Sequence, residues 1–234
     1  MPFHKTFKKF VKKCDKIQID KSEVTEVIEK FCLFLVSKMR KSNPDIDDEK
    51  AEIINYGLQL IIGEIPKIFI TIIVAYALGI LKLTLIMIMI MIPYRSFSGG
   101  FHLHTHIGCV ISTTLFYCGI PKISNYIYLY SETKYIFVLC ALIFGIITLI
   151  KYAPADTENV PILRQKERRQ KKFLACITYT LGLIFAAIIN NNVISNIIIL
   201  GYIIQTIMTT PLAYWLTKNK YGYKIYNLSS ERPA

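Results

Sequence analysis

The chain has 234 residues, 53% of them hydrophobic, and its mean hydropathy of +0.41 exceeds that of an ordinary soluble domain. The apolar residues come in blocks of Ile, Leu, Val and Phe, as in helices that are apolar all round and lie in a bilayer. We attribute the net charge of +12 to membrane topology and contact with anionic lipid, and expect no nucleic-acid partner. The six cysteines are interpreted as free thiols, because the chain is neither short nor obviously extracellular.

The N-terminal region, residues 1–52, is expected to carry amphipathic helices on the cytoplasmic side. In residues 1–22, aromatic and other apolar residues recur at helical spacing and lysines fill the opposite face. This pattern predicts a basic amphipathic helix on an anionic membrane surface. A lysine-rich tail without structure is the alternative. A second helix is predicted after Ser22, with Phe31 and Met39 on its buried face.

The next part of the chain, residues 53–216, is predicted to be a polytopic helical membrane domain, followed by a cytoplasmic tail over residues 217–234. Six spans are expected: 56–81, 83–93, 107–120, 135–150, 173–189 and 194–216. An even number of spans places both termini on one side. That side holds 24 Lys and Arg residues against three on the other, so the positive-inside rule makes it the cytoplasm of a bacterial cell.

Two of these spans are shorter than the roughly 20 residues that a full crossing needs. Residues 83–93 and 107–120 are therefore expected either as half-helices around a buried polar turn, or as broken helices that extend through residues 94–106. A charged pair in the first span is a further irregularity. The favoured interpretation is a span that begins near Pro66, and the alternative is an internal Glu64/Lys67 pair.

The densest polar cluster of the membrane half lies in residues 95–109 and contains His102 and Cys109. An imidazole near a cysteine takes the thiol proton and stabilises the thiolate that a cysteine protease needs. Seven residues of straight helix would separate the two backbones by about 10 Å, so the segment must bend. The glycines that permit such a bend are Gly99, Gly100 and Gly108.

A metal site or a transporter path is the competing interpretation of the same segment. His102, His104 and His106 would share one face of a strand, and imidazoles with a thiolate are good zinc ligands. No second group of carboxylates or cysteines accompanies them, so neither a metal nor another cofactor is expected. The alternative function, from a different class, is that of a small permease whose histidines line a proton or metal path.

The segment resembles the accessory gene regulator protein B (AgrB) family of Gram-positive bacteria. Members carry an Arg, a Gly-Gly-aromatic-His and a Cys seven residues after that His. The matching residues here are Arg95, Gly99, Gly100, Phe101, His102 and Cys109. The resemblance extends over residues 24–216 and includes the segment 152–161 with the basic run after it. The basic N-terminus and the additional His104 and His106 depart from the family pattern.

The resemblance implies a membrane cysteine endopeptidase of quorum sensing. Such an enzyme cleaves a short precursor at the C-terminal side of the signal and cyclises it to a thiolactone or lactone through an acyl-enzyme thioester. His102 and Cys109 are then the catalytic pair, and the supporting or substrate-binding residues are Arg95, Gly99, Gly100, Gly108, Pro154 and Asp156. The expected partners are the precursor peptide and anionic lipid, and a homodimer is compatible with a small membrane enzyme.

Overall fold

A computed structural model of the chain describes residues 21–43, 46–101, 103, 106–157, 161–162 and 164–225. Within this part, the regular elements are helical, and one isolated parallel bridge joins Gly99 and Ala155. The elements are α2 (Lys21–Ser42), α3 (Asp48–Ala77), α4 (Leu81–Ser98), α5 (His106–Thr114), the π-helical η1 (Leu115–Gly119), α6 (Ile120–Ser124), α7 (Ser131–Tyr152), α8 (Gln165–Ile188), α9 (Asn192–Ile207), α10 (Pro211–Leu216) and α11 (Gly222–Ile225). The predicted all-α class is confirmed. Nearly all of the predicted helix over residues 1–22 lies outside the described residues.

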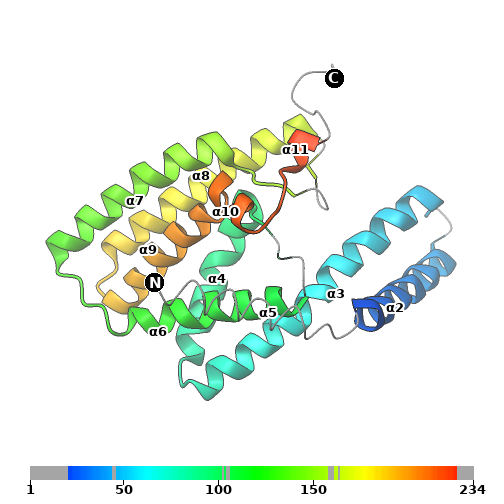
Figure 1. Cartoon of the computed structure of the whole chain (residues 1–234), viewed down its shortest axis with the longest axis horizontal. Helices are drawn as coiled ribbons and strands as arrows, with labels where there is room; N and C mark the ends of the chain where they lie inside the picture. The colour runs from blue at the N-terminus through cyan, green and yellow to red at the C-terminus, as the bar shows by residue number, and fades with distance from the viewer. Residues whose placement is uncertain are drawn as a thin grey trace.

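The second predicted helix, α2, forms a hairpin with the first half of α3 that extends away from the other helices (Figure 1). Among the α2 side chains that the structure describes, Cys32 and Val36 are buried, whereas Phe31 is 51% exposed and Met39 is 44% exposed. Phe31 and Met39 therefore do not lie on the buried face that the sequence predicted. In a membrane protein, apolarity alone does not distinguish a face turned to lipid from one turned to protein.

In the part of the chain that the structure describes, four helical segments are long and apolar enough to cross a membrane, namely α4, the continuous run Ile107–Ser124, α7 and α8. The two spans that the sequence predicted as short are each 18 residues long. α4 passes through Pro93 and ends at Ser98, and Ile107–Ser124 continues through the π-helical turn η1. α4 therefore extends beyond residue 93 as the second interpretation expected, whereas the other segment is lengthened at its far end, from Ile120 to Ser124.

Of the other two predicted spans, residues 56–81 lie largely within α3, where residues 56 and 59–61 have no described side chains, and residues 194–216 begin in α9. The last one is interrupted, because α9 has only 16 residues and ends at Ile207. A short turn follows, and Pro211 opens α10, a position that suits proline because its missing N–H needs no partner there. The expected single helix over 194–216 is therefore two helices.

α3 runs without interruption from Asp48 to Ala77 and contains Pro66 in its interior, so the helix itself does not begin at Pro66. The Glu64/Lys67 pair of the alternative interpretation is formed, because Lys67 Nζ donates a hydrogen bond to the Glu64 carboxylate. Where the membrane span begins along α3 stays a prediction. The Lys67 side chain is only 9% exposed, and a buried charge is tolerated where an opposite charge pairs with it.

Three tyrosines pack together at the centre of the bundle, where α4 crosses α8 and α9. The ring of Tyr94 lies 5.3 Å from that of Tyr179 and 4.6 Å from that of Tyr202, between centroids. Tyr179 also donates a hydrogen bond of 2.7 Å to the Ala141 carbonyl of α7. Gly145 admits this ring, because a Cβ there would lie 2.1 Å from Tyr179 Cζ. These contacts fix α4, whose C-terminal end leads into the candidate site.

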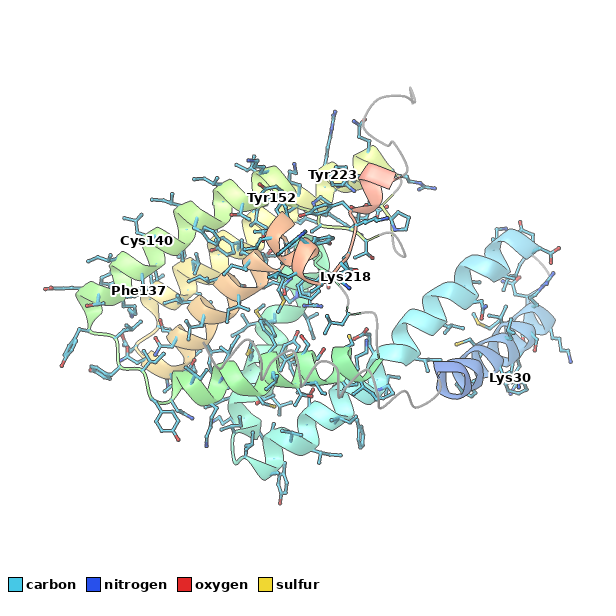
Figure 2. All side chains as sticks on the ribbon, in the orientation of Figure 1. Lys30, Phe137, Cys140, Tyr152, Lys218 and Tyr223 are labelled. Atoms are coloured by element: carbon cyan, nitrogen blue, oxygen red, sulfur yellow. The ribbon has the colours of Figure 1, made fainter. Side chains whose placement is uncertain are left out.

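The outer face of α7 is covered with apolar side chains, and Phe137 and Cys140 point away from the bundle (Figure 2). The other large apolar side chains exposed on α7 are Tyr135, Ile136, Leu139, Ile143, Phe144, Ile147 and Ile150. Monomeric soluble proteins rarely expose an apolar surface of this kind. Together with the four long apolar helices, this surface identifies a membrane protein.

Candidate active site

The chain leaves α4 through two glycines that lie against a distant segment. Gly100 N donates to the Ala155 carbonyl and Ala155 N donates to the Ser98 carbonyl, each over 2.9 Å. Gly99 and Gly100 have φ angles of +74° and +144°, which only glycine adopts readily. A Cβ on Gly99 would also lie 2.4 Å from the Ala155 carbonyl oxygen. Both the conformation and the close approach therefore require glycine at position 99.

Gln205 of α9 holds the same glycines from the other side. Its Nε2 donates to the Gly99 carbonyl over 2.7 Å and to Ser98 Oγ over 3.2 Å, while its Oε1 accepts from Arg95 over 3.0 Å. The side chain is fully buried. Sequence reasoning missed Gln205, although an amide within an apolar membrane segment is the kind of costly residue that points to a function.

Pro154 and Asp156 support the site from behind Ala155. Asp156 Oδ2 accepts hydrogen bonds from Arg168 over 2.8 Å and from Ile162 N over 3.1 Å. Arg168 also donates to the Pro154 carbonyl over 3.2 Å. The Asp156 side chain is completely buried, and its Oδ2 anchors the backbone here through these contacts. The structure thus joins Pro154 and Asp156 to the Gly99–Gly100 segment through Ala155.

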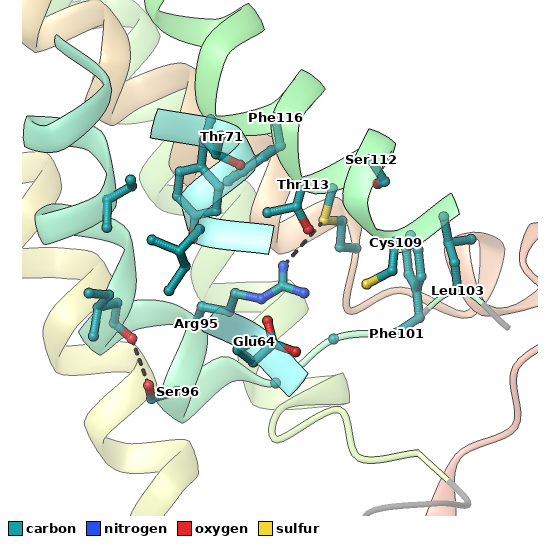
Figure 3. Close-up of a pocket in the computed structure, with 17 residues that line it drawn as sticks. Glu64, Thr71, Arg95, Ser96, Phe101, Leu103, Cys109, Ser112, Thr113 and Phe116 are labelled. Atoms are coloured by element: carbon teal, nitrogen blue, oxygen red, sulfur yellow. Dashed lines mark hydrogen bonds between the residues drawn. The ribbon is translucent and has the colours of Figure 1, made fainter. Parts of the chain in front are cut away.

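A pocket of about 450 Å³ lies between α3, α4 and α5, and Cys109 is part of its wall. Figure 3 shows the Arg95 guanidinium and the Cys109 sulfur directed toward the same space. Glu64, Gly99 and Gly100 also line it. Most of the remaining wall is apolar and is formed by Ile68, Ile88, Ile92, Phe101, Leu103, Phe116, Tyr117 and Met208. The pocket is therefore a largely apolar space with two charged groups and one thiol.

Cys109 is a partly exposed free thiol in the first turn of α5, next to Gly108. His102 and His104 lie outside the described residues, and so does the side chain of His106. The contact between His102 and Cys109 therefore stays a prediction. The two sequence neighbours of His102, Phe101 and Leu103, line the same pocket as Cys109.

Among the side chains that the structure describes, no group of three His, Cys, Asp or Glu residues has the arrangement of a metal site. The histidines of the competing metal interpretation are not among these side chains. The pocket itself brings one thiol and one carboxylate, Cys109 and Glu64, to its surface.

Comparison with protein families settles the relationship suggested by residues 95–109. A profile of the family described as Accessory gene regulator B matches residues 32–209, which include α4, Cys109 and the 154–156 segment. The chain belongs to this family. AgrB proteins act in the biosynthesis of autoinducing peptides, the signals of quorum sensing, and are involved in peptide processing.

Two curated AgrB relatives are similar over most of their length. An AgrB-like protein of Listeria innocua serovar 6a is 28% identical over 201 residues, which cover 85% of this chain and 94% of the relative. The accessory gene regulator protein B of Staphylococcus aureus strain JH9 is 28% identical over 161 residues, which cover 69% of this chain and 83% of the relative. No solved structure matches the chain.

Proposed function

We propose that the chain is a membrane cysteine endopeptidase that cleaves a short signalling-peptide precursor and cyclises the product, with Cys109 as nucleophile and His102 as general base. One observation carries this proposal. Cys109 opens onto a pocket whose wall also contains both sequence neighbours of His102, Phe101 and Leu103. Gly99 and Gly100, through which the chain leaves α4, also line this pocket.

In the first step, the imidazole of His102 takes the proton of the Cys109 thiol. The thiolate attacks the carbonyl carbon at the C-terminal boundary of the future signal. The C–N bond breaks, and the imidazolium gives its proton to the leaving amine of the precursor's tail. The signal remains bound to Cys109 Sγ as a thioester.

In the second step, an internal thiol of the precursor, or a hydroxyl in a lactone-forming substrate, attacks the thioester carbon. The attacking group gives up its proton to His102, and Cys109 Sγ leaves and is reprotonated, so the ring closes and the enzyme is regenerated. Exchange of a peptide bond for a thioester is uphill, so removal of the released tail must draw the reaction forward. Cyclisation must also be faster than hydrolysis of the thioester. The largely apolar pocket favours cyclisation because it limits access of water.

The charges around the pocket suit an anionic part of the substrate. Arg95 lines the pocket, and so does Glu64, but the Glu64 carboxylate is paired with Lys67. The site therefore has an excess of positive charge, supplied by Arg95, and this charge favours binding of an acidic precursor tail. α5 begins three residues before Cys109, so the positive end of its dipole lies near the sulfur and stabilises negative charge there.

Cleavage can be tested in cells that co-express this protein with a candidate precursor, a short amphipathic peptide with an internal Cys. Wild type and Cys140→Ala are expected to release the tail, whereas Cys109→Ala and His102→Ala are not. Cys140 is the matched control, since it is an exposed thiol on the outer face of α7. Mass spectrometry should detect the tail and a thioester adduct on Cys109. Release of the tail by Cys109→Ala would exclude the proposal.

A further inference from the structure

The matched family region ends at residue 209, but the folded chain continues. Residues 210–225, here called the C-terminal strap, contain α10 and α11, and α11 lies near the start of α8 (Figure 1). Tyr214 of α10 is only 2% exposed, although its neighbour Trp215 is 74% exposed. One face of the strap is therefore packed into the protein.

Tyr214 reaches the backbone that holds the glycine segment. Its hydroxyl lies 2.9 Å from the Ala155 carbonyl oxygen and 3.1 Å from that of Asp156, and donates to them. The Ala155 carbonyl is also the acceptor for Gly100 N. A tyrosine hydroxyl is protonated at neutral pH, so Tyr214 can donate these hydrogen bonds.

The ring of Tyr214 contacts the other side of the same segment. Phe101 packs against it edge-on, with ring centroids 6.4 Å apart and an interplanar angle of 88°. Phe101 immediately precedes His102 in the sequence and lines the pocket beside Cys109. A single side chain of the strap thus contacts Phe101 directly and Gly100 through one shared carbonyl.

The strap is itself held in place at several points. Tyr221 stacks on Tyr214 with centroids 4.0 Å apart, and its hydroxyl donates to the Thr209 carbonyl over 2.8 Å. Arg168, the partner of Asp156, lies over the ring of Tyr223 at 4.9 Å. These contacts tie the strap to the loop that contains Ala155, so Tyr214 is a fixed part of the site's surroundings.

We propose that the C-terminal strap is a positioning element of the active site, in which Tyr214 fixes the backbone of Gly100 and Phe101, from which the chain enters His102. The inference rests on the proposed catalytic pair. Its physical basis is that a displacement of about 1 Å in a catalytic group can lower a rate by about 100-fold. Residues outside the matched family region would then control the geometry of the reaction.

The test measures alkylation of Cys109 by iodoacetamide in the full chain in detergent, from pH 6 to pH 9, with the modified peptide quantified by mass spectrometry. An imidazole that takes the thiol proton keeps the alkylation fast at pH 6. Tyr214→Phe removes the hydrogen bonds and keeps the ring. Trp215→Phe is the matched control on the same helix, and Tyr221→Phe loosens the strap without changing Tyr214. Helical circular dichroism verifies that each variant is folded.

Relative to wild type, His102→Ala should slow alkylation at pH 6 by about 10-fold or more, since it removes the group that takes the thiol proton. We expect the alkylation rate of Tyr214→Phe at pH 6 to fall most of the way to the rate of His102→Ala. The rate of Tyr221→Phe should fall part of the way, and the rate of Trp215→Phe should match that of wild type. Cleavage by Tyr214→Phe should fall in kcat with little change in KM. If Tyr214→Phe and Tyr221→Phe both follow wild type while His102→Ala does not, the strap inference is overturned and the catalytic pair stands. If the alkylation rates of wild type and His102→Ala depend on pH in the same way, both the strap inference and the catalytic pair are overturned.

Discussion

Gln205 donates a 2.7 Å hydrogen bond to the carbonyl oxygen of Gly99, although 106 residues separate the two in sequence. The same side chain accepts a hydrogen bond from Arg95, so one buried amide joins the pocket's cation to the glycine segment. Gln205 therefore determines the position of Arg95 and of the chain that leads toward His102. An amide is suited to this task because it donates and accepts at the same time.

Substitution of Gln205 by Leu should leave the Gly99 carbonyl and the Arg95 guanidinium short of a partner in a buried region. We expect a loss of about 1–3 kcal/mol in the free energy of unfolding, the usual cost of a buried polar group without its hydrogen bond. Cleavage of the precursor should slow as well. Thermal unfolding in detergent, followed by circular dichroism, measures the first effect.

Gln165→Leu provides the control for this change, since Gln165 is an exposed amide at the start of α8. Its stability should stay within about 0.5 kcal/mol of wild type. Gln205→Glu adds a further distinction, because a carboxylate still accepts from Arg95 but cannot donate to Gly99. Wild-type cleavage by Gln205→Glu would show that the bond to Gly99 has no role.

The N-terminus of α3 should respond to acid through its cap. Asp47 accepts a hydrogen bond from Lys50 N over 2.8 Å, and this bond lowers the pKa of Asp47 below its ordinary value. A lowered folded-state pKa means that the cap contributes fully above the unfolded pKa of about 3.9 and is lost as pH falls through the lower, folded value. Hydrogen exchange at the first turn of α3 should therefore accelerate as the pH falls below about 3.9, once the intrinsic rates are corrected.

Asp47→Asn separates this cap from the nearby ion pair of Arg40 and Asp48, which also weakens in acid. Asparagine is as good a cap as aspartate but does not titrate. The variant should lose the part of the acid response that comes from Asp47. If wild type and Asp47→Asn respond equally, the cap does not contribute to the pH dependence.

The buried ion pair of Asp156 and Arg168 should be one of the most sensitive contacts of the site. Asp156→Asn keeps the size of the side chain but leaves Arg168, which is 18% exposed, without its counter-charge. Removal of one partner of a buried pair costs about 3–5 kcal/mol. We expect a large decrease in the unfolding temperature and a loss of processing.

Glu167→Gln is the matched control for that pair, since it breaks an exposed ion pair with Lys171 on the same helix. An exposed pair contributes about 0–1 kcal/mol, so the change should be small. Similar losses in Asp156→Asn and Glu167→Gln would mean that Asp156 does not anchor the loop.

The local features of the fold could be predicted from the sequence, because they depend on neighbouring residues. The all-α class followed from the apolar blocks, and the positive φ angles at positions 99 and 100 suit the two adjacent glycines that the sequence singled out. Helix boundaries were less certain: Pro66 and Pro93 suggested interruptions, yet each lies within a continuous helix. Proline disfavours a helix locally, but packing of the whole element can outweigh that cost.

The long-range partners of the site could not be predicted in the same way. Arg168 belongs to a basic run whose charge has a sufficient explanation in topology, and nothing in that run distinguishes it from its neighbours. Gln205 and Tyr214 likewise acquire their roles only when α9 and α10 pack against the glycine segment. Spacing along one chain indicates which residues share a helix face, but not which helices meet.

The glycine at position 99 offers the sharpest test of the backbone arrangement, because the chain contains a matched control. Gly79 has a φ of +67°, close to that of Gly99, but a Cβ there would meet nothing within 4 Å. Gly79→Ala should therefore cost only the conformational penalty of about 1–2 kcal/mol. Gly99→Ala adds a collision with the Ala155 carbonyl oxygen, so it should destabilise the protein more and abolish processing. Equal unfolding temperatures for the two variants would mean that Gly99 does not lie against Ala155, and the path of the chain toward Cys109 would then need another explanation.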